Sequence, residues 1–339
     1  MESLFQKKEE WFSFYDRKGQ IIKRKTEVRF DPLTGESSRL VEDPGIQFVV
    51  PDYTRIAEQT DGKNCPFCPE NIDQLTPLFS KEIIDEGQIT VGEATVFPNL
   101  FPYSKYNGVT VLSDQHYVRL HEFTTPMLTD AFIACQTFIR RTLTHDSNQR
   151  LSTSINWNYL PYSGGSIIHP HFHVVISESS TNYQNTLRRK LKSFQEHHGD
   201  DYFNVLYTAE KNGERWIGER GRVAWIHTFA PKSHHDYVAI FRDSPSITNI
   251  SEKEWQHFSE GLQAIFTTLN DAGLASFNMI LTDSNGTSPV HARIIPRLTL
   301  GQIGTSDINF FQALHGEPLC YKTPENVARN ARKYFKTVT

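Results

Sequence analysis

Long apolar runs and a signal peptide are both missing from this sequence. No stretch approaches the roughly 18 apolar residues that a membrane-spanning helix needs. The N-terminal run MESLFQKKEE lacks the apolar core of a secretory signal. These absences predict a cytoplasmic protein with no membrane partner.

An excess of basic charge is also missing. The formal net charge is -4 and the isoelectric point is about 6.4, whereas a nucleic-acid surface needs a basic stripe. The local basic run at 188–192 is expected to be the solvated face of a helix. Nucleic acid is therefore not an expected partner, but small anionic substrates stay open because a few local cations and dipoles can bind them.

Cysteine is scarce, since four cysteines in 339 residues do not make a disulfide scaffold. Cys135 falls in a helix-period run and is expected in the core, and Cys320 is isolated. Cys65 and Cys68 form a C-x-x-C pair, whose two thiolates can bind one face of a tetrahedral zinc ion. A redox pair or an ordinary turn remains open on this motif alone.

The strongest functional signal in the sequence is a row of closely spaced histidines. Segment 166–176 reads SIIHPHFHVVI, and side chains alternate between the two sides of a strand. The row therefore consists of His169, His171 and His173 on one face, opposite Phe172, Val174 and Ile176 on a core face. Core imidazoles need partners and surface imidazoles have no reason to line up, so the row predicts a functional site.

A glycine-rich turn precedes the row. Segment 158–166 reads NYLPYSGGS, and small residues let backbone N–H groups approach a phosphate. The turn is a weak signal alone, but beside a nucleophilic histidine it suggests phosphoryl or nucleotidyl transfer. The candidate donors to phosphoryl oxygens are Asn158, Gly164, Gly165 and Ser166.

These motifs resemble a known family. The histidine strand resembles that of the histidine-triad superfamily, and its His-Pro-His core resembles the galactose-1-phosphate uridylyltransferase family. Segments 29–36 and 323–329 are similar to the family's N-terminal segment and last helix, so the resemblance spans about 29–332. The string NCPFCPEN resembles the family's zinc knuckle. The resemblance thus implies a structural zinc bound by Cys65, Cys68, His116 and His169.

The resemblance also implies a mechanism and an activity. A neutral His171 would attack the α-phosphorus of a nucleotide sugar, and a second sugar phosphate would take the nucleotide in a ping-pong transfer. The expected enzyme moves a nucleoside monophosphate, expected to be UMP, between a nucleotide sugar and a hexose 1-phosphate in galactose and carbohydrate metabolism. Asn99 would lie near the nucleotide. Members often form homodimers.

One departure opens an alternative. His173 stands where the family has a Gln that holds the intermediate, and an imidazole can also exchange a proton with water. A hydrolase or phosphorylase of nucleotide sugars or dinucleotides is therefore the competing function. A zinc-stabilised nucleotide-binding module is a third interpretation. The residues decide neither between uracil and adenine nor which hexose is carried.

An internal repeat predicts the architecture. Asn156 precedes His169 by the same number of residues as Asn278 precedes His291. We expect an α+β fold of two tandem histidine-triad-like half-domains, 1–199 and 200–339, related by a pseudo-twofold axis. Each would be an antiparallel sheet with helices to one side. The second half carries Arg293 at its nucleophile position, so we expect Arg293 to complete the substrate site.

Overall fold

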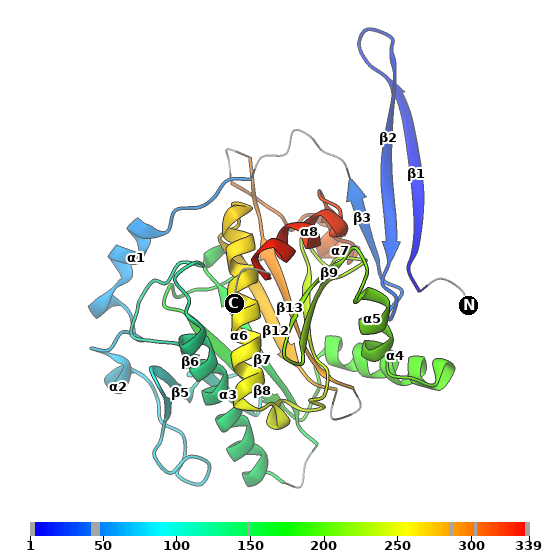
Figure 1. Cartoon of the computed structure of the whole chain (residues 1–339). Coiled ribbons are helices and arrows are strands. Elements are labelled where there is room, and N and C mark those ends of the chain that lie inside the picture. Colours follow the sequence, from blue (N-terminus) through cyan, green and yellow to red (C-terminus); the bar gives the residue numbers. More distant parts are fainter. Residues whose placement is uncertain are drawn as a thin grey trace.

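A ten-stranded antiparallel sheet lies at the centre of the computed structural model, which describes residues 4–335 except 42–47, 148–149, 285, 287 and 302–303 (Figure 1). The strands of its first half, in order across the sheet, are β4 (Ile89–Val91), β5 (Ala94–Pro98), β6 (Tyr106–Val111), β8 (His171–Ser177) and β7 (Ser152–Tyr159). The order continues through β12 (Ser276–Thr282), β13 (Val290–Arg297), β11 (Tyr237–Phe241), β10 (Val223–His227) and β9 (Trp216–Arg220).

The strand order of one half mirrors that of the other. At the junction, Trp157 on β7 pairs with Met279 on β12, and these two positions are separated in the chain by the same interval as His169 and His291. Equivalent positions of the repeat thus meet at the centre, as a twofold axis between β7 and β12 requires. The α+β class is confirmed. Unlike the expected two sheets, the halves share one continuous sheet, because β7 pairs with β12.

Two long helices cover one face of this sheet. They are α3 (Thr125–His145) and α6 (Glu252–Asp271), and both have a side-chain cap at the N-terminus. The cap of α6 is a capping box between Ser251 and Glu254, as its sequence predicts. Phe132 of α3 stacks on Trp255 of α6 and on Phe172 of β8, with ring centroids 5.1 and 4.8 Å apart. The apolar face of the histidine strand is therefore in the core.

Gly261 lets α6 approach the sheet closely. A Cβ atom at this position would lie 2.3 Å from Nε1 of Trp225, whose ring is fully buried. We expect Gly261→Ala to lower the free energy of unfolding by about 1–3 kcal/mol, because helix and sheet must separate. Urea unfolding would measure the loss, with Lys253→Ala on the exposed side of the same helix as the control. Equal stability of the two variants would contradict this packing argument.

Two further helices cover the opposite face of the second half. Leu187 and Leu191 of α4 (Asn182–His198) and Leu206 of α5 (Tyr202–Glu210) form a cluster with Ile226 and Val238 of the sheet. The expectation of helices on one side only is therefore wrong for this half. Although α4 precedes the expected boundary at residue 199, it packs on strands of the second half. The division into 1–199 and 200–339 stays a prediction, and 1–3 and 336–339 lie outside the described residues.

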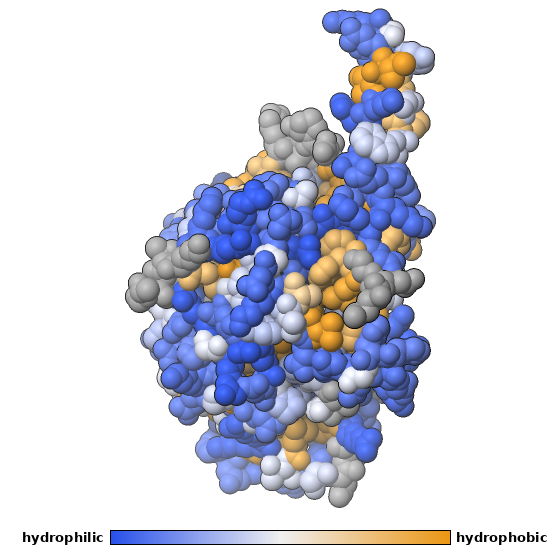
Figure 2. Space-filling model, turned by 45° about the vertical axis from the view of Figure 1, so that its right-hand side comes forward, coloured by the Kyte–Doolittle hydropathy of each residue, from blue (hydrophilic) through white to orange (hydrophobic). Residues whose placement is uncertain are grey.

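The N-terminal segment forms a smaller sheet with the end of the chain. Its strands are β1 (Gln6–Tyr15), β2 (Ile21–Phe30), β3 (Ser37–Val41) and β16 (Leu319–Cys320). Arg29 of β2 donates two hydrogen bonds to Glu325 of α8 (Pro324–Phe335), at 2.8 and 3.0 Å. The two end segments that resemble the family therefore contact each other. The tip of the β1–β2 hairpin stands away from the body and exposes hydrophobic residues among hydrophilic ones (Figures 1 and 2).

The remaining elements are short. They are α1 (Thr54–Thr60), η1 (Gly62–Asn64), α2 (Ile72–Leu75), η2 (Pro161–Ser163), η3 (Ile247–Asn249), β14 (Thr299–Leu300), β15 (Thr305–Ser306) and α7 (Phe310–Leu314), where η marks a 3₁₀ helix. Among the helices of the described residues, none has the length and apolar character to cross a membrane.

Candidate active site and metal centre

Four potential metal ligands meet at the start of the histidine strand. They are the predicted Cys65, Cys68, His116 and His169, all buried, and their ligand atoms lie within 4.8 Å of one another. Sγ of Cys68 is 3.4 Å from Nδ1 of His116 and 3.7 Å from Nδ1 of His169. A tetrahedral zinc ion with ordinary bond lengths places sulfur and nitrogen ligands about 3.6 Å apart. The cluster therefore has the donor types and the spacing of a closed zinc site.

Hydrogen bonds on the far side of the rings orient both histidines. Nε2 of His169 donates to the carbonyl oxygen of Ser113 at 2.7 Å, and Nε2 of His116 lies 3.0 Å from Oγ1 of Thr60. Each Nδ1 is left facing the cysteines, and a metal-binding histidine usually has its other ring nitrogen held by a hydrogen bond in this way. Burial lowers the pKa of His169 to about 4 and raises the pKa of Cys68 to about 12. A bound cation would favour the thiolate over the thiol.

His171 is positioned as a nucleophile. Its ring is 6% exposed, and Nδ1 lies 2.7 Å from the carbonyl oxygen of His169. A carbonyl can only accept, so Nδ1 carries the proton and Nε2 carries the free lone pair. Burial lowers the pKa of His171, which keeps the imidazole neutral. The ring of Phe67 contacts it edge-on at 5.1 Å.

Phe67 joins the metal cluster to this histidine. It lies inside the C-x-x-C motif, between Cys65 and Cys68, and is also buried against Phe97 of β5. The same short turn that supplies two ligands therefore supplies a wall for the His171 ring. Sequence reasoning did not identify Phe67, and its place between the two cysteines was the signal available.

His173 lies beside His171, with the ring centroids 5.1 Å apart. Its Nδ1 is 3.1 Å from the hydroxyl of Tyr103, in the loop between β5 and β6. Burial, with a smaller contribution from His171, lowers the pKa of His173 to about 4. The ring is therefore neutral near pH 7 and a weak proton acceptor. Tyr103 was not identified from the sequence, because nothing local marks that loop as a neighbour of the strand.

Asn99 holds the same loop. Its side-chain amide donates to Oδ1 of Asn107 at 2.9 Å, and the backbone N–H of Tyr103 lies 3.4 Å from that oxygen. Asn99 therefore lies in the network that places Tyr103 against His173. Its expected closeness to a bound nucleotide stays a prediction.

The glycine-rich turn differs from the expected phosphate cradle. The N–H of Gly164 donates to Pro161 at 2.9 Å, and the N–H of Gly165 donates to Leu160 at 3.2 Å. Both groups are used inside the turn and are not available to a phosphate in this conformation. A Cβ atom at position 165 would lie 2.8 Å from the carbonyl oxygen of Asn158, so glycine is required for close approach.

Two other predicted donors remain accessible at this turn. Ser166 is exposed. Oδ1 of Asn158 accepts a hydrogen bond from Asn278 at 2.8 Å, and the same amide of Asn278 donates to the carbonyl oxygen of Ser163 at 2.7 Å. The second half of the chain therefore reaches this site through Asn278, a residue that the repeat pointed to only as a spacing marker.

Arg293 is not near His171. Across the sheet, His173 is opposite Asn156, Asn156 is opposite Ile280, and Ile280 is opposite Arg293. Three strand spacings separate Arg293 from His173, or about 14 Å. Within one chain the structure does not bring Arg293 to the histidine site, because β7 and β12 lie between the two halves' equivalent strands.

Comparisons with known proteins give one relative and a shared fold. No family model matches the sequence. An uncharacterized protein of Archaeoglobus fulgidus is 32% identical over 320 residues, which is 94% of each chain. A GalT-like protein from Arabidopsis thaliana superposes with a TM-score of 0.69 at 16% identity, over 90% of this chain and 98% of that one.

Two enzyme structures show the same fold. ADP-glucose phosphorylase from Arabidopsis thaliana, with bound ADP-glucose, gives a TM-score of 0.69 at 17% identity, over 91% of this chain and 99% of that one. A uridylyltransferase gives 0.67 at 18% identity, over 92% and 99%. These identities establish the fold and leave the chemistry to the residues of the site.

Proposed function

We propose that this chain, which belongs to one family with the Archaeoglobus fulgidus protein, is a nucleotidyltransferase. It has the fold of the uridylyltransferases. It would move a nucleoside monophosphate, expected to be UMP, between a nucleotide sugar and a hexose 1-phosphate. The observation that carries the proposal is the geometry of His171, whose Nδ1–H is fixed on the His169 carbonyl. That bond leaves Nε2 as a nucleophile held on a rigid strand.

In the first step, the lone pair of Nε2 forms a bond to the α-phosphorus of the nucleotide sugar. The bond from that phosphorus to the bridging oxygen breaks, and sugar 1-phosphate leaves with the electron pair. The His171 ring then carries a positive charge, which the His169 carbonyl oxygen stabilises through Nδ1–H. A phosphate oxygen of the second sugar phosphate attacks the adduct and restores neutral imidazole.

We also propose that the cluster of two cysteines and two histidines holds a structural zinc ion. With all four positions taken by protein ligands, the ion would leave no place for water and would serve as an anchor. His169 connects the anchor to the chemistry, because its ring belongs to the cluster and its carbonyl oxygen accepts from His171. Zinc bound to the His169 ring would therefore hold in place the carbonyl oxygen that fixes the tautomer of His171.

Phosphorolysis or hydrolysis on the same scaffold is the alternative. ADP-glucose phosphorylase shares the fold, and His173 stands where a transferase has Gln. Water needs a general base with a pKa near the working pH, whereas burial lowers the pKa of His173 to about 4. This favours a phosphate acceptor, which is already ionised, over water. Phosphate oxygens of a hexose 1-phosphate or of orthophosphate both meet that condition.

The test is product analysis with labelled UDP-glucose and ADP-glucose. Each would be offered galactose 1-phosphate, orthophosphate or water as the acceptor, and an acid-labile, base-stable protein adduct would be isolated. Transfer to galactose 1-phosphate supports the proposal. Products from orthophosphate alone support the phosphorylase, and tight binding without adduct or products supports the nucleotide-binding module.

His173→Gln separates a donor role from assistance to water. If His173 only donates a hydrogen bond to the adduct, the variant should keep transfer within about threefold of wild type. If His173 assists water, hydrolysis should fall selectively by about tenfold to 100-fold and the ratio of transfer to hydrolysis should rise. The ratio is measured from labelled products in one reaction. An unchanged ratio would refute a special role of His173 in hydrolysis.

A further inference from the structure

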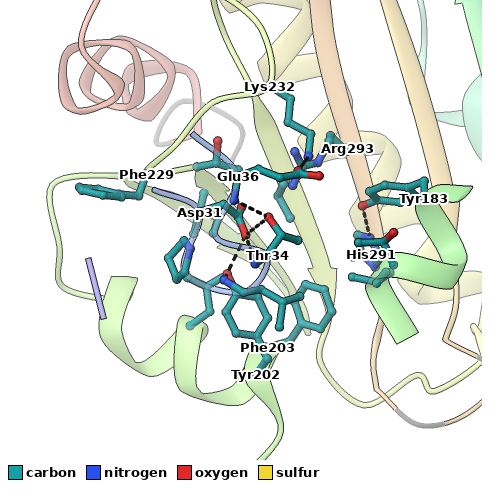
Figure 3. A pocket seen from close by; sticks show the side chains of 18 of the residues that line it. Asp31, Thr34, Glu36, Tyr183, Tyr202, Phe203, Phe229, Lys232, His291 and Arg293 are labelled. Atoms are coloured by element: carbon teal, nitrogen blue, oxygen red, sulfur yellow. Dashed lines mark hydrogen bonds and ion pairs between the residues drawn. The ribbon is translucent and has the colours of Figure 1, made fainter. Parts of the chain in front are cut away.

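A pocket lies over the second half of the sheet (Figure 3). It opens on the same face as His173, since residues opposite each other on neighbouring strands point to the same side. Its walls come from segment 31–36, from α4 and α5, and from strands β10, β11 and β13. Its volume is about 280 Å³. Most of the lining is apolar or aromatic, including Leu187, Phe203, Ile226 and Phe229.

Polar groups without partners lie in this apolar setting. Nη1 of Arg293 donates to Oδ2 of Asp236 at 3.0 Å, but Nε of Arg293 is buried with no partner among the described residues. His291 is 2% exposed, and its Nε2 is 3.0 Å from the hydroxyl of Tyr183. Its Nδ1 likewise finds no partner in the described part of the chain. Both residues line the cavity. Buried polar atoms are almost always paired, so two unpaired atoms in residues of one cavity wall point to a ligand.

The charge arrangement suits an anion at one end. Oδ2 of Asp236 also accepts from Oγ1 of Thr228 and from the N–H of Lys232, so this oxygen stays occupied. Oδ1 of Asp236 has no partner among the described residues, and Nε of Arg293 remains a donor for a ligand. The ammonium of Lys232 pairs with Glu36 at a partly exposed position. Such a pair is weak in water and can open at little cost. Arg293 and Lys232 could then contact one anionic group.

The internal repeat narrows the choice of anion. Arg293 occupies on β13 the place of His171 on β8, in the symmetry that the Trp157–Met279 pair defines. The pocket is thus the second half's counterpart of the candidate active site, and at this step the inference rests on the proposed nucleotide chemistry of His171. A guanidinium binds phosphate in the planar, two-point manner but cannot attack phosphorus.

We propose that this pocket is a second, non-catalytic site for a nucleoside monophosphate. The phosphate would accept from Nε of Arg293 and from Lys232, and the planar base would lie among Leu187, Phe203 and Ile226. The volume of about 280 Å³ is slightly below the usual range of about 300–1,000 Å³ for ligand pockets, which fits a mononucleotide better than a nucleotide sugar.

Calorimetric titration of the full chain with UMP and with AMP tests this proposal. Thr186→Trp, on the pocket side of α4, would fill the cavity, and Thr208→Trp, on the exposed side of α5, is the matched control. We expect Thr186→Trp to lose one equivalent of bound nucleotide per chain, and Thr208→Trp to retain it. Arg293→Lys, which keeps a charge for Asp236, should weaken the same equivalent at least tenfold.

Further ligands separate the phosphate from the base. Uridine and adenosine should bind the second site at least tenfold more weakly than their monophosphates, and inorganic phosphate should also bind more weakly. Equal binding of inorganic phosphate would overturn the assignment to a nucleotide. Equal stoichiometry for the two tryptophan variants would overturn the site itself.

The adduct assay keeps this inference separate from the proposed function. Thr186→Trp should form the His171 adduct at a rate within about twofold of wild type. Loss of one bound equivalent in Thr186→Trp, in a protein that never forms an adduct, would refute the transferase and leave the pocket standing. A Thr186→Trp protein that forms the adduct normally and loses no bound equivalent would support the transferase and refute the nucleotide site in the pocket.

Discussion

Replacing His171 with Asn should abolish both the nucleotidyl adduct and turnover while the fold is retained. The change removes the only atom proposed to bond to phosphorus, so turnover should fall on the order of 10⁴-fold or more. In the wild-type protein the His169 carbonyl oxygen accepts a hydrogen bond from Nδ1 of His171. Asn is smaller than His, but its side-chain amide can still donate to the same carbonyl oxygen. Loss of activity would therefore not require loss of the local structure.

Isolation of labelled protein after incubation with a nucleotide sugar measures the adduct, and thermal unfolding measures the fold. His197→Asn, on an exposed turn of α4, is the matched control and should behave as wild type. His173→Gln provides a second comparison within the strand and should still form the adduct. An adduct on the His171→Asn protein would rule out the covalent scheme proposed for this histidine.

Replacing Cys65 with Ser should remove the metal and a large part of the stability. One of four ligands is lost, and the binding free energy of a structural zinc ion is also folding free energy. We expect the free energy of unfolding to fall by about 3 kcal/mol or more. Adduct formation should also slow, because the same turn places Phe67 against His171 and the cluster holds His169.

Metal analysis of purified wild-type protein should find close to one equivalent of zinc, and the Cys65→Ser protein should contain much less. Cys135→Ser is the matched control, since Cys135 is equally buried but contacts Thr110 outside the cluster. It should keep the full metal content. Metal-free wild-type protein that is as stable as the metal-loaded form would exclude the proposed zinc anchor.

The sequence by itself determined the features that depend on local periodicity. Alternation along 171–176 placed Phe172, Val174 and Ile176 in the core and His171 and His173 on the other face, and all three apolar side chains are fully buried. His169 was expected on the same strand but precedes it, because β8 begins at His171. The capping box at Ser251 was readable because both of its partners lie within one helical turn. The equal spacing of the repeat anticipated the mirrored strand order.

The set of metal ligands needed more than spacing. The C-x-x-C spacing identified Cys65 and Cys68 as a pair, whereas His116 and His169 were assigned by family resemblance. The structure brings all four together from three separate segments. Local pattern cannot supply such a set, because nothing in a turn records which distant segment will pack against it.

Only the tertiary structure decided which side chains of the two halves lie close together. Alternation tells which face a side chain occupies, but strand pairing decides its neighbours, and the pairing of β7 with β12 put Arg293 three strands from His173. The same long-range packing placed Tyr103 at His173 and used the amides of Gly164 and Gly165 inside their own turn. Sequence period fixes a direction for each side chain, whereas distance across a sheet depends on contacts between segments far apart in the chain.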